Sequence, residues 1–490
     1  MTTVDKLKQA VALDVYDASV TQVGDLTYFL ARRDGAKFVG SVGDGEISGE
    51  PVGQIGGVPV LVGPTDHGNA RAVRKVLPWT APRCLGLATS VGLGDRLGLA
   101  TPGHIRAVRG TGLAPILAQQ SIREMTRTQR TPDEVMDAAT WGVLQEGFRE
   151  PFGADADHLQ QPGDIDQTAA AGFQMFTIDP GRHVENQADE FPVNLLADYL
   201  DKMDFAALEI SPADLKSAYV GKTFALAGGG SVSFDEIAFL RAMVKYGAAV
   251  AHTAAMYRRL SQAARGEFEL EVSVDETDSP TTPAEHYFFA NELKRLGVRW
   301  VSMGPRFVGR FEKGVDYIGN PNAFRESFAA HAAVMRTLGP YKISIHSGSD
   351  KFSIYPIVAE LTGGLVHLKT AGTSYLEALR ALAQVSPALF REILDFARGR
   401  YDEDKATYHV SGTVQKVPPA DSLKDSDLPA LLDQFDARQV LHCTFGSVLT
   451  ADGGAKFRRR MFEALGRDEE AHYAALAKHL GRHVAPFVQR

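Results

Sequence analysis

Short apolar runs that end in polar residues alternate with longer stretches of helical spacing along most of this chain. Strands that alternate with helices predict a parallel sheet with crossover helices. An open doubly wound sheet and a closed barrel both fit this order, and eight strands with polar carboxyl ends favour the α/β class with a (β/α)8 TIM barrel. The functional site is therefore expected at the carboxyl ends of the strands. The eight runs are CLGLATSV (84–91), LAPILAQQ (113–120), GADADHL (153–159), FQMFTID (173–179), ELEVSVDET (269–277), VRWVSMGPR (298–306), ISIHSGSD (343–350) and GLVHLKT (364–370).

The stretches outside these runs predict additions to the barrel. Residues 26–64 alternate β-forming residues with Gly, Asp and Pro turns, which predicts a small antiparallel sheet. The chain between Asp179 and Glu269 is too long for one crossover helix, so we expect a helical insertion after the fourth strand, placed to cover the site. The expected layout is a β-rich cap (1–83), a catalytic barrel (84–375) with its insertion (about 181–265), and a helical C-terminal extension (376–490).

Composition and charge narrow the class of partner. The chain has 490 residues, of which 44% are hydrophobic and 23% charged, enough for a large core. A formal net charge of -8 without a basic block offers little to nucleic acid or to a membrane surface, so a small-molecule ligand is expected. Two cysteines, Cys84 and Cys443, exclude a disulfide framework, and the N-terminus lacks a signal-peptide pattern. These features predict a cytoplasmic protein, and a homo-oligomer is compatible with them.

One predicted strand carries acidic residues on alternate positions. In ELEVSVDET the period of two places Glu269, Glu271, Ser273 and Asp275 on one face. A carboxylate inside a barrel is costly unless it is paired or bound to a cation. The pattern therefore indicates a charged site at this strand end. The alternative is an exposed edge strand with a solvated acidic face.

Two histidines stand at other strand ends. His346 precedes a Gly-containing turn in ISIHSGSD, and His158 follows Asp157 in GADADHL. A histidine before a tight loop suits a metal ligand or a proton carrier, although a single one is more often a buried side chain with satisfied hydrogen bonds. Nitrogen and oxygen ligands from three strand ends together favour a divalent metal such as zinc, manganese, cobalt or nickel.

Several cationic residues follow predicted strands. Arg306 and Lys369 stand at strand ends, so they are candidates for holding an anionic substrate. Arg310 and Lys313 lie farther along the same loop, where surface ion pairs are the simpler interpretation.

Two glycine-rich segments resemble nucleotide loops without meeting their requirements. GLGDRLG (92–98) has the spacing GxGxxxG, a proline soon after it, and no acidic residue about twenty positions later, as a dinucleotide site requires. GGGSVS (228–233) has no Lys-Ser or Lys-Thr after it. We expect neither to bind a nucleotide.

Several longer motifs resemble the tagaturonate epimerase family, whose members interconvert tagaturonate and fructuronate and include tagatose 4-epimerases. The resemblance covers most of the chain from about residue 84 onward. More distantly, the Asp-His pair, the Glu of LEVSV and the His-Ser-Gly turn are similar to metal-dependent class II aldolases. The motifs are AQQSIREMTRTQRTPDEVMDAA (118–139), ADADHL (154–159), MFTIDPGRHV (175–184), VSVDETDSPTTPAEHYF (272–288), PRFVGRFEKGVDYIGN (305–320), ISIHSGSDKFSIYP (343–356) and HLKTAGTSY (367–375).

The resemblance implies an isomerase that acts on a sugar acid or ketose with the help of a divalent metal. Epimerisation of a 2-ketose at C4 cannot use simple enolisation, because C4 is one carbon too far from the carbonyl. Cleavage and re-formation of the C3–C4 bond is therefore expected. The implied metal ligands are His158, Glu271 and His346. The implied proton carriers are Asp157, with Glu276 or Asp179 as a second one. The implied substrate-binding residues are Gln120, Ser121, Thr177, Arg306 and Lys369.

Some alternatives stay open at this point. His367 shares its strand face with Lys369 and is a rival metal ligand, whereas His442 is expected to be structural unless the C-terminal extension folds back to the site. Within enzymes, the rival functions are a class II-type sugar aldolase and a ketose–aldose isomerase. Outside enzymes, the rival is a non-catalytic protein that binds sugar acids.

Overall fold

The computed structural model describes residues 3–488 and contains a closed barrel of eight parallel strands. Each strand pairs with the next along the chain, and the last pairs with the first. The closed order confirms the TIM barrel and excludes the open sheet. The strands are β7 (Ser90–Gly94), β8 (Ala114–Ser121), β9 (Gly153–Leu159), β10 (Met175–Ile178), β13 (Glu269–Ser273), β14 (Ser302–Gly304), β15 (Lys342–Ile345) and β16 (Val366–Lys369).

The first strand begins later than the apolar run predicts. Residues 84–89 lie outside any strand and include a turn closed by the bond from Ala88 N–H to the Leu85 carbonyl, in which Gly86 has a φ of 60°. Strand β7 starts at Ser90 and continues into the glycine-rich GLG. The prediction of a strand over 84–91 was therefore wrong at its start. Glycine at 92 and 94 suits this strand, because a Cβ on Gly92 would lie 3.3 Å from the Gln119 side chain.

The interior of the barrel is polar, whereas its outer face is apolar. Leu270 and Val272 of β13 are buried in the large core that the strands share with the surrounding helices. Ionisable side chains of the opposite parity are also buried, and they contact one another directly or through the Ser90 hydroxyl. They include Asp155, Glu271, Lys342, His367 and Lys369. Because β13 lies between two neighbours in a closed barrel, the edge-strand interpretation of ELEVSVDET was wrong.

Helices follow the strands and cover the barrel. Several begin with strong N-terminal signals, such as the capping box of Thr282 and Glu285 with Pro283 in the first turn. The crossover helices are α3 (Thr101–Val108), α5 (Pro132–Glu146), α6 (Pro162–Ala170), α9 (Glu236–Ala263), α10 (Pro283–Arg295), α11 (Pro321–Leu338), α12 (Tyr355–Thr362) and α13 (Thr373–Val385), and the short α4 (Ile122–Thr128) precedes α5. Among residues 3–488, no helix is both long and apolar enough to cross a bilayer.

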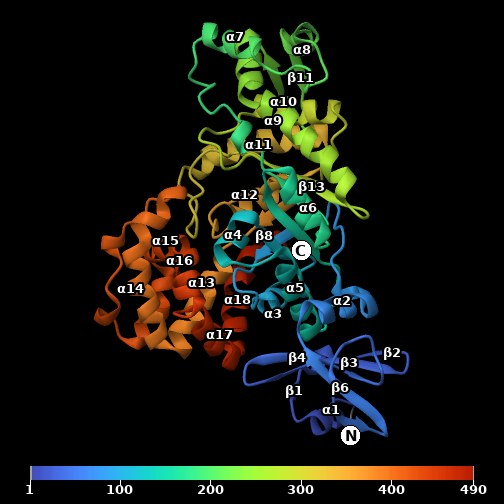
Figure 1. The fold of residues 1–490 in the computed structure, drawn as a ribbon. Coiled ribbons are helices and arrows are strands. Elements are labelled where there is room, and N and C mark those ends of the chain that lie inside the picture. Colours follow the sequence, from blue (N-terminus) through green and yellow to red (C-terminus); the bar gives the residue numbers. More distant parts are fainter. Residues whose placement is uncertain (1–2, 489–490) are drawn as a thin grey trace.

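A six-stranded antiparallel sheet precedes the barrel, as the turn-rich pattern of 26–64 predicts. Its residues Leu30 and Val39 pack with α2 (His67–Val76) against Trp141 of α5, so the sheet lies beside α2 at one end of the molecule (Figure 1). The helix α1 (Thr3–Val11) packs on its other side. The strands are β1 (Asp14–Val15), β2 (Thr21–Val23), β3 (Leu26–Arg33), β4 (Ala36–Val42), β5 (Glu50–Ile55) and β6 (Val58–Pro64).

The chain between β10 and β13 forms an insertion that is largely helical. The insertion also contains an antiparallel hairpin, whose turn holds the glycines of GGGSVS. It projects from one end of the molecule, away from the N-terminal sheet (Figure 1). Its elements are α7 (Val193–Asp201), α8 (Pro212–Tyr219), β11 (Lys222–Ala225), β12 (Ser231–Phe234) and the long helix α9.

The chain after α13 is helical, and its apolar residues form a second hydrophobic core together with α13. The extension therefore packs on the side of the barrel (Figure 1). Its last helix, α18, lies between α13 and α3. The helical extension was thus predicted correctly. Its helices are α14 (Pro387–Asp404), α15 (Phe435–Cys443), α16 (Phe445–Thr450), α17 (Arg458–Arg467) and α18 (Glu469–Val484).

Candidate active site

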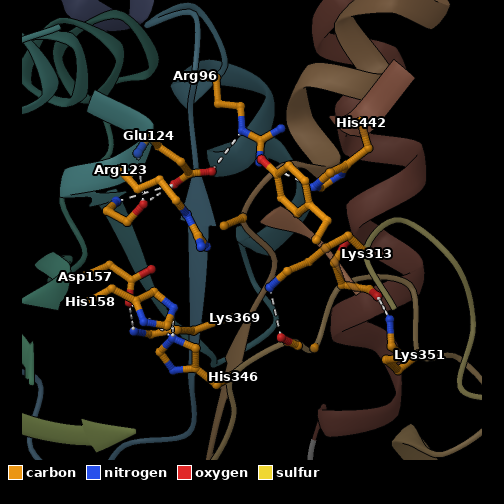
Figure 2. A pocket seen from close by; sticks show the side chains of 16 residues that line it. Arg96, Arg123, Glu124, Asp157, His158, Lys313, His346, Lys351, Lys369 and His442 are labelled. Atoms are coloured by element: carbon orange, nitrogen blue, oxygen red, sulfur yellow. Dashed lines mark hydrogen bonds and ion pairs between the residues drawn. The ribbon is translucent and has the colours of Figure 1, made fainter. Parts of the chain in front are cut away.

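A pocket opens at the carboxyl ends of the barrel strands (Figure 2). Its floor includes Asp157 and His158 of β9, His346 after β15 and Lys369 of β16. The opposite wall includes His442 of α15, so the C-terminal extension closes the pocket.

This arrangement corrects the expectation that the insertion covers the site. Within the described chain, no residue of 181–265 lines the pocket, whereas Tyr408 and His442 of the extension do. The physical reason is that α15 is anchored to the loop after β14, where Arg438 donates to the carbonyl oxygen of Gly314 (2.5 Å).

Two histidines face each other at the centre of the pocket floor. Nε2 of His158 lies 2.9 Å from Nε2 of His346. His158 has a φ of 52°, in the left-handed region that side chains other than glycine rarely adopt. Strict alternation along β9 would put neighbouring residues on opposite faces, yet both Asp157 and His158 line the pocket. Such local strain is typical of functional sites.

The other nitrogen of each histidine is held by a carboxylate. Nδ1 of His158 lies 3.1 Å from Asp179, and Nδ1 of His346 lies 3.0 Å from Glu271. Asp179 is itself fixed by the side chain of Gln160 and by a backbone N–H. For His158 this is the role of a carboxylate behind a metal-binding histidine, because Asp179 orients the ring and increases its basicity. Glu271 contacts His346 through Oε1 and keeps Oε2 unpaired among the described residues.

Lys369 is buried beneath the histidines inside a cage of carboxylates. Its Nζ lies 2.8 Å from Asp155, 2.6 Å from Asp157 and 2.9 Å from Glu271. It also donates to the Thr177 hydroxyl (2.7 Å). Burial disfavours its charge, but the three carboxylates outweigh burial and raise the pKa of Lys369. The side chain is therefore a fixed cation that holds the acidic residues in place.

The charges of the site follow from this cage. Burial would raise the pKa of Asp157 and of Glu271, but the Lys369 ammonium and the neighbouring imidazoles hold both pKa values well below the usual range. For His346, burial and Lys369 oppose protonation, yet Asp275 and Asp157 raise its pKa to about 10. The site thus combines ionised carboxylates with imidazoles in a setting that favours a cation.

The donor set fits a divalent metal ion. Asp157, His158 and His346 each offer a ligand atom, and these atoms lie within 4.8 Å of one another. Two imidazole nitrogens bound to one ion at about 2.0–2.1 Å lie roughly 3 Å apart, close to the separation of the histidines. Oε2 of Glu271 is buried and has no hydrogen-bond partner among the described residues, as expected for an acceptor that awaits a cation.

A second acidic and histidine-rich cluster lies behind the pocket and is already satisfied. Asp350 accepts from His479 (2.6 Å) and pairs with Arg438 (2.9 Å), while its backbone N–H donates to His483. The other nitrogen of His479 faces Glu377 (3.3 Å). These contacts use the lone pairs that a metal ion would need, so we do not assign a metal to this cluster. Its role is to join the loop after β15 to the extension.

The predicted substrate-binding residues fall into different places. Ser121 lines the pocket and caps α4, and Thr177 donates to Asp155 (2.9 Å) within the charged interior. Gln120 is fully buried, does not line the pocket, and has no partner for its amide among the described residues. Arg306 lines an adjoining pocket. Glu276 lines the same adjoining pocket, with Oε1 3.9 Å from Nε2 of His158.

Three residues in or beneath the pocket have contacts that differ from the sequence-based expectations. Gln119, not Gln120, donates to Asp157 (2.9 Å), because a register shift between β8 and β9 changes which residues face inward. Lys313 lines the pocket although surface ion pairing seemed the simpler role. His367 lies deeper, bonded to Ser90 (2.9 Å), and burial lowers its pKa to about 3.

Comparisons with known proteins agree with this architecture. A family model described as tagaturonate epimerase matches residues 16–487. The tagaturonate/fructuronate epimerase of Thermotoga maritima is 41% identical over 484 residues, which cover 96% of this chain and 96% of that protein. The native crystal structure of the fructuronate-tagaturonate epimerase from Cohnella laeviribosi is 36% identical, with a TM-score of 0.92 over 99% of both chains.

A glycerol complex of the Cohnella laeviribosi protein matches equally well, with a TM-score of 0.92 over 99% of this chain and 98% of that one. These relatives are epimerases and the matches extend over nearly the whole length, so this chain is an enzyme of the isomerase class. It belongs to the tagaturonate epimerase family.

Proposed function

We propose that this enzyme interconverts D-tagaturonate and D-fructuronate by epimerising C4 in ketose numbering, through cleavage and re-formation of the C3–C4 bond. The observation that carries this proposal is the pair of facing histidines beside Asp157, above the Lys369 cage and at the floor of the pocket. The names of the relatives support the substrate pair.

The metal site is assigned to His158, His346 and Glu271. A divalent cation bound there would polarise the C2 carbonyl of the substrate as a Lewis acid. Glu271 is completely buried and has the unpartnered Oε2, whereas Asp157 lines the pocket, where a substrate can reach it. We therefore assign Glu271 to the metal and Asp157 to the substrate. The close approach of Asp157 to Nε2 of His346 (3.3 Å) makes it the rival ligand.

Proton transfer at the C4 oxygen is assigned to Asp157. Its carboxylate is kept ionised by Lys369 and oriented by Gln119, so it can accept the C4 hydroxyl proton as the C3–C4 bond breaks. The electron pair of the C3–C4 bond passes to the C1–C3 fragment, where it is delocalised toward the C2 carbonyl as an enediolate. C4 of the other fragment becomes an aldehyde. After the aldehyde half rotates, attack on its opposite face restores the bond and the proton returns to the C4 oxygen.

Glu276 and Asp179 divide the secondary roles. Asp179 bonds to His158 from behind, so it orients this ring. Glu276 lies on the pocket side of the same imidazole and is the better placed second proton carrier. The oligomeric state and the cytoplasmic location stay predictions of the sequence.

The test combines product analysis with metal removal. Purified enzyme supplied with fructuronate should form tagaturonate without accumulating three-carbon fragments, and EDTA should abolish turnover that Zn²⁺, Mn²⁺, Co²⁺ or Ni²⁺ restores. Asp157→Asn should keep its metal by elemental analysis and lose about 100-fold or more in kcat, whereas Glu271→Gln should lose metal. Accumulated fragments would indicate an aldolase. Near-normal turnover of Asp157→Asn with bound metal would refute the base assignment, and loss of metal from Asp157→Asn would place Asp157 among the ligands.

A further inference from the structure

The substrates proposed above carry a carboxylate, and several cations in the pocket are already engaged by protein groups. Arg96 donates to Glu124 (2.8 Å) and lies over the ring of Phe445, and its Nη1, which has no partner among the described residues, is buried. Lys369 is enclosed by three carboxylates. Lys351 donates to three backbone carbonyl oxygens at 2.7–2.8 Å, which uses all of its N–H groups.

Lys313 differs from these three, because its ammonium has donor capacity left on the pocket side, whereas Arg123 directs both of its Nη atoms at Glu276. Nζ contacts the hydroxyl of Ser347 (3.0 Å), and that hydroxyl donates in turn to Asp275 (2.9 Å). The other neighbour, Glu276, is 3.5 Å away and already paired with Arg123 (3.0 Å). Figure 2 shows the ammonium reaching toward the middle of the pocket. An ammonium has three donors, and Ser347 engages only one of them at a normal distance.

The charge around Lys313 also suits an anion. Arg123, Glu276 and Lys313, which are in direct contact, together carry one positive charge in excess, and the Asp275 carboxylate is separated from Lys313 by the Ser347 hydroxyl. The same Glu276 oxygen that contacts Lys313 lies 3.9 Å from Nε2 of His158. The Lys313 ammonium is therefore linked to His158 through the Glu276 carboxylate and lies outside the Lys369 cage.

The loop that carries Lys313 is held in a buried frame. Lys351 binds the carbonyl oxygens of Glu312 and Val315 on either side of it. The Glu312 carboxylate accepts from Gln439 of α15 (2.9 Å), and Arg438 binds the carbonyl of Gly314. Because the flanking residues are fixed from both the barrel and the extension, the ammonium is presented at a defined position.

We propose that Lys313 receives the carboxylate of the hexuronate substrate, with Arg123 as its neighbour across Glu276, and so selects uronates over neutral ketoses. This inference rests on the proposed function. In a six-carbon 2-ketose acid the carboxylate lies at the end opposite to the carbonyl that the histidine site engages. The Lys313 ammonium contacts the same Glu276 oxygen that approaches His158, and it is placed to receive this carboxylate.

The experiment compares Lys313→Gln with Lys313→Arg and with the control Arg310→Gln. Arg310 is a cation of the same loop with a largely exposed side chain. Steady-state kinetics with fructuronate would give KM and kcat, and neutral D-fructose and D-tagatose would be measured as competitive inhibitors. Calorimetric binding of fructuronate and of D-fructose to each protein gives a readout that does not need turnover. Melting temperatures confirm that each variant is folded.

The expected result is an increase of roughly 10- to 100-fold in KM and Kd for the uronate in Lys313→Gln, because a charge-assisted contact is lost. Affinities for the neutral ketoses should change less than about threefold, while Lys313→Arg and Arg310→Gln stay near the wild type. Equal weakening of uronate and ketose binding, or an unchanged uronate KM, would overturn the proposal. Uronate binding that depends on Lys313 in a protein without epimerase activity would support the subsite and refute the proposed function.

Discussion

Asp350→Asn should lower the stability of the enzyme and loosen the loop that follows His346. The Asp350 carboxylate accepts hydrogen bonds from Thr373 (3.0 Å) and His479 (2.6 Å) and pairs with Arg438 (2.9 Å), all in the buried junction between barrel and extension. Asparagine keeps the volume but removes the charge, and its amide N–H groups would face a donor. Among the residues that the structure describes, Arg438 would then have only Glu377, at 3.7 Å, as a nearby counter-charge.

The size of the effect follows from the loss of a buried ionic partner, which costs about 3–5 kcal/mol. An unfolding entropy of roughly 2 cal/mol/K per residue gives about 1 kcal/mol/K for a chain of 490 residues, so Tm should fall by about 3–5 °C if unfolding is cooperative. Thermal unfolding followed by circular dichroism at about pH 7.5 would measure this. The control is Asp433→Asn, which removes an exposed partner of Arg380 and should shift Tm by less than about 1 °C.

The pH dependence gives a second check on Asp350. Burial would raise its pKa, but Arg438 and His479 hold the pKa well below the ordinary value in the folded state. The stabilisation is therefore complete above the unfolded pKa of about 3.9 and is lost as pH falls through the lower folded value. The difference in Tm between wild type and variant should be full at about pH 7.5 and narrow below about pH 4. A variant as stable as the wild type near neutral pH would refute the role of this network.

Two further substitutions, one of them with a matched control, probe the junctions of the fold. Gly372→Ala should cost about 2–4 kcal/mol and lower kcat, because a Cβ there would overlap the His442 ring and lie 2.8 Å from Arg96, at a φ of 90°. Gly221→Ala, with a φ of 76° and open space around it, isolates the backbone strain at about 1–2 kcal/mol, and equal losses in both variants would argue against the clash. Glu469→Gln should destabilise the N-terminal sheet by about 1–3 kcal/mol with kcat unchanged, because Glu469 accepts from Tyr16 (2.9 Å) and Arg32 (2.8 Å). Hydrogen exchange of residues 14–64 measures this, and unchanged protection there would contradict it.

The barrel could be predicted from sequence because its signal is local and repeated. Each strand is a short apolar run such as ISI before His346, and the polar ends mark one edge of the barrel. The histidine pair could be predicted for the same reason, since strand ends converge. The first strand was misplaced because its glycine-rich part resembles a loop, and the preceding apolar residues, such as Leu85 and Leu87, lie in a turn.

The other site residues could not be predicted, because their positions depend on contacts between segments and not on the alternation of residues along one strand. The register shift that turns Gln119 inward depends on the pairing of β8 with β9, and the left-handed φ of His158 depends on its surroundings. Lys313 resembles any surface lysine until the extension fixes its loop. His442 reaches the pocket only because α15 packs against the loops that follow β14 and β16, more than 70 residues after the last barrel strand. Such contacts between distant segments are set by tertiary packing.

The pocket wall built from α15 has a consequence for the order in which this enzyme becomes active during synthesis. The barrel strands leave the ribosome first, but the residues that fix the Lys313 loop and the Asp350 junction are Gln439, Arg438 and His479. The N-terminal sheet likewise gains its bond from Tyr16 to Glu469 only when Glu469, 453 positions later in the chain, has been synthesised. Loops of this length close slowly. A nascent chain that ends after β16 thus lacks these contacts, so the binding site is finished only after α15 and α18 have been synthesised.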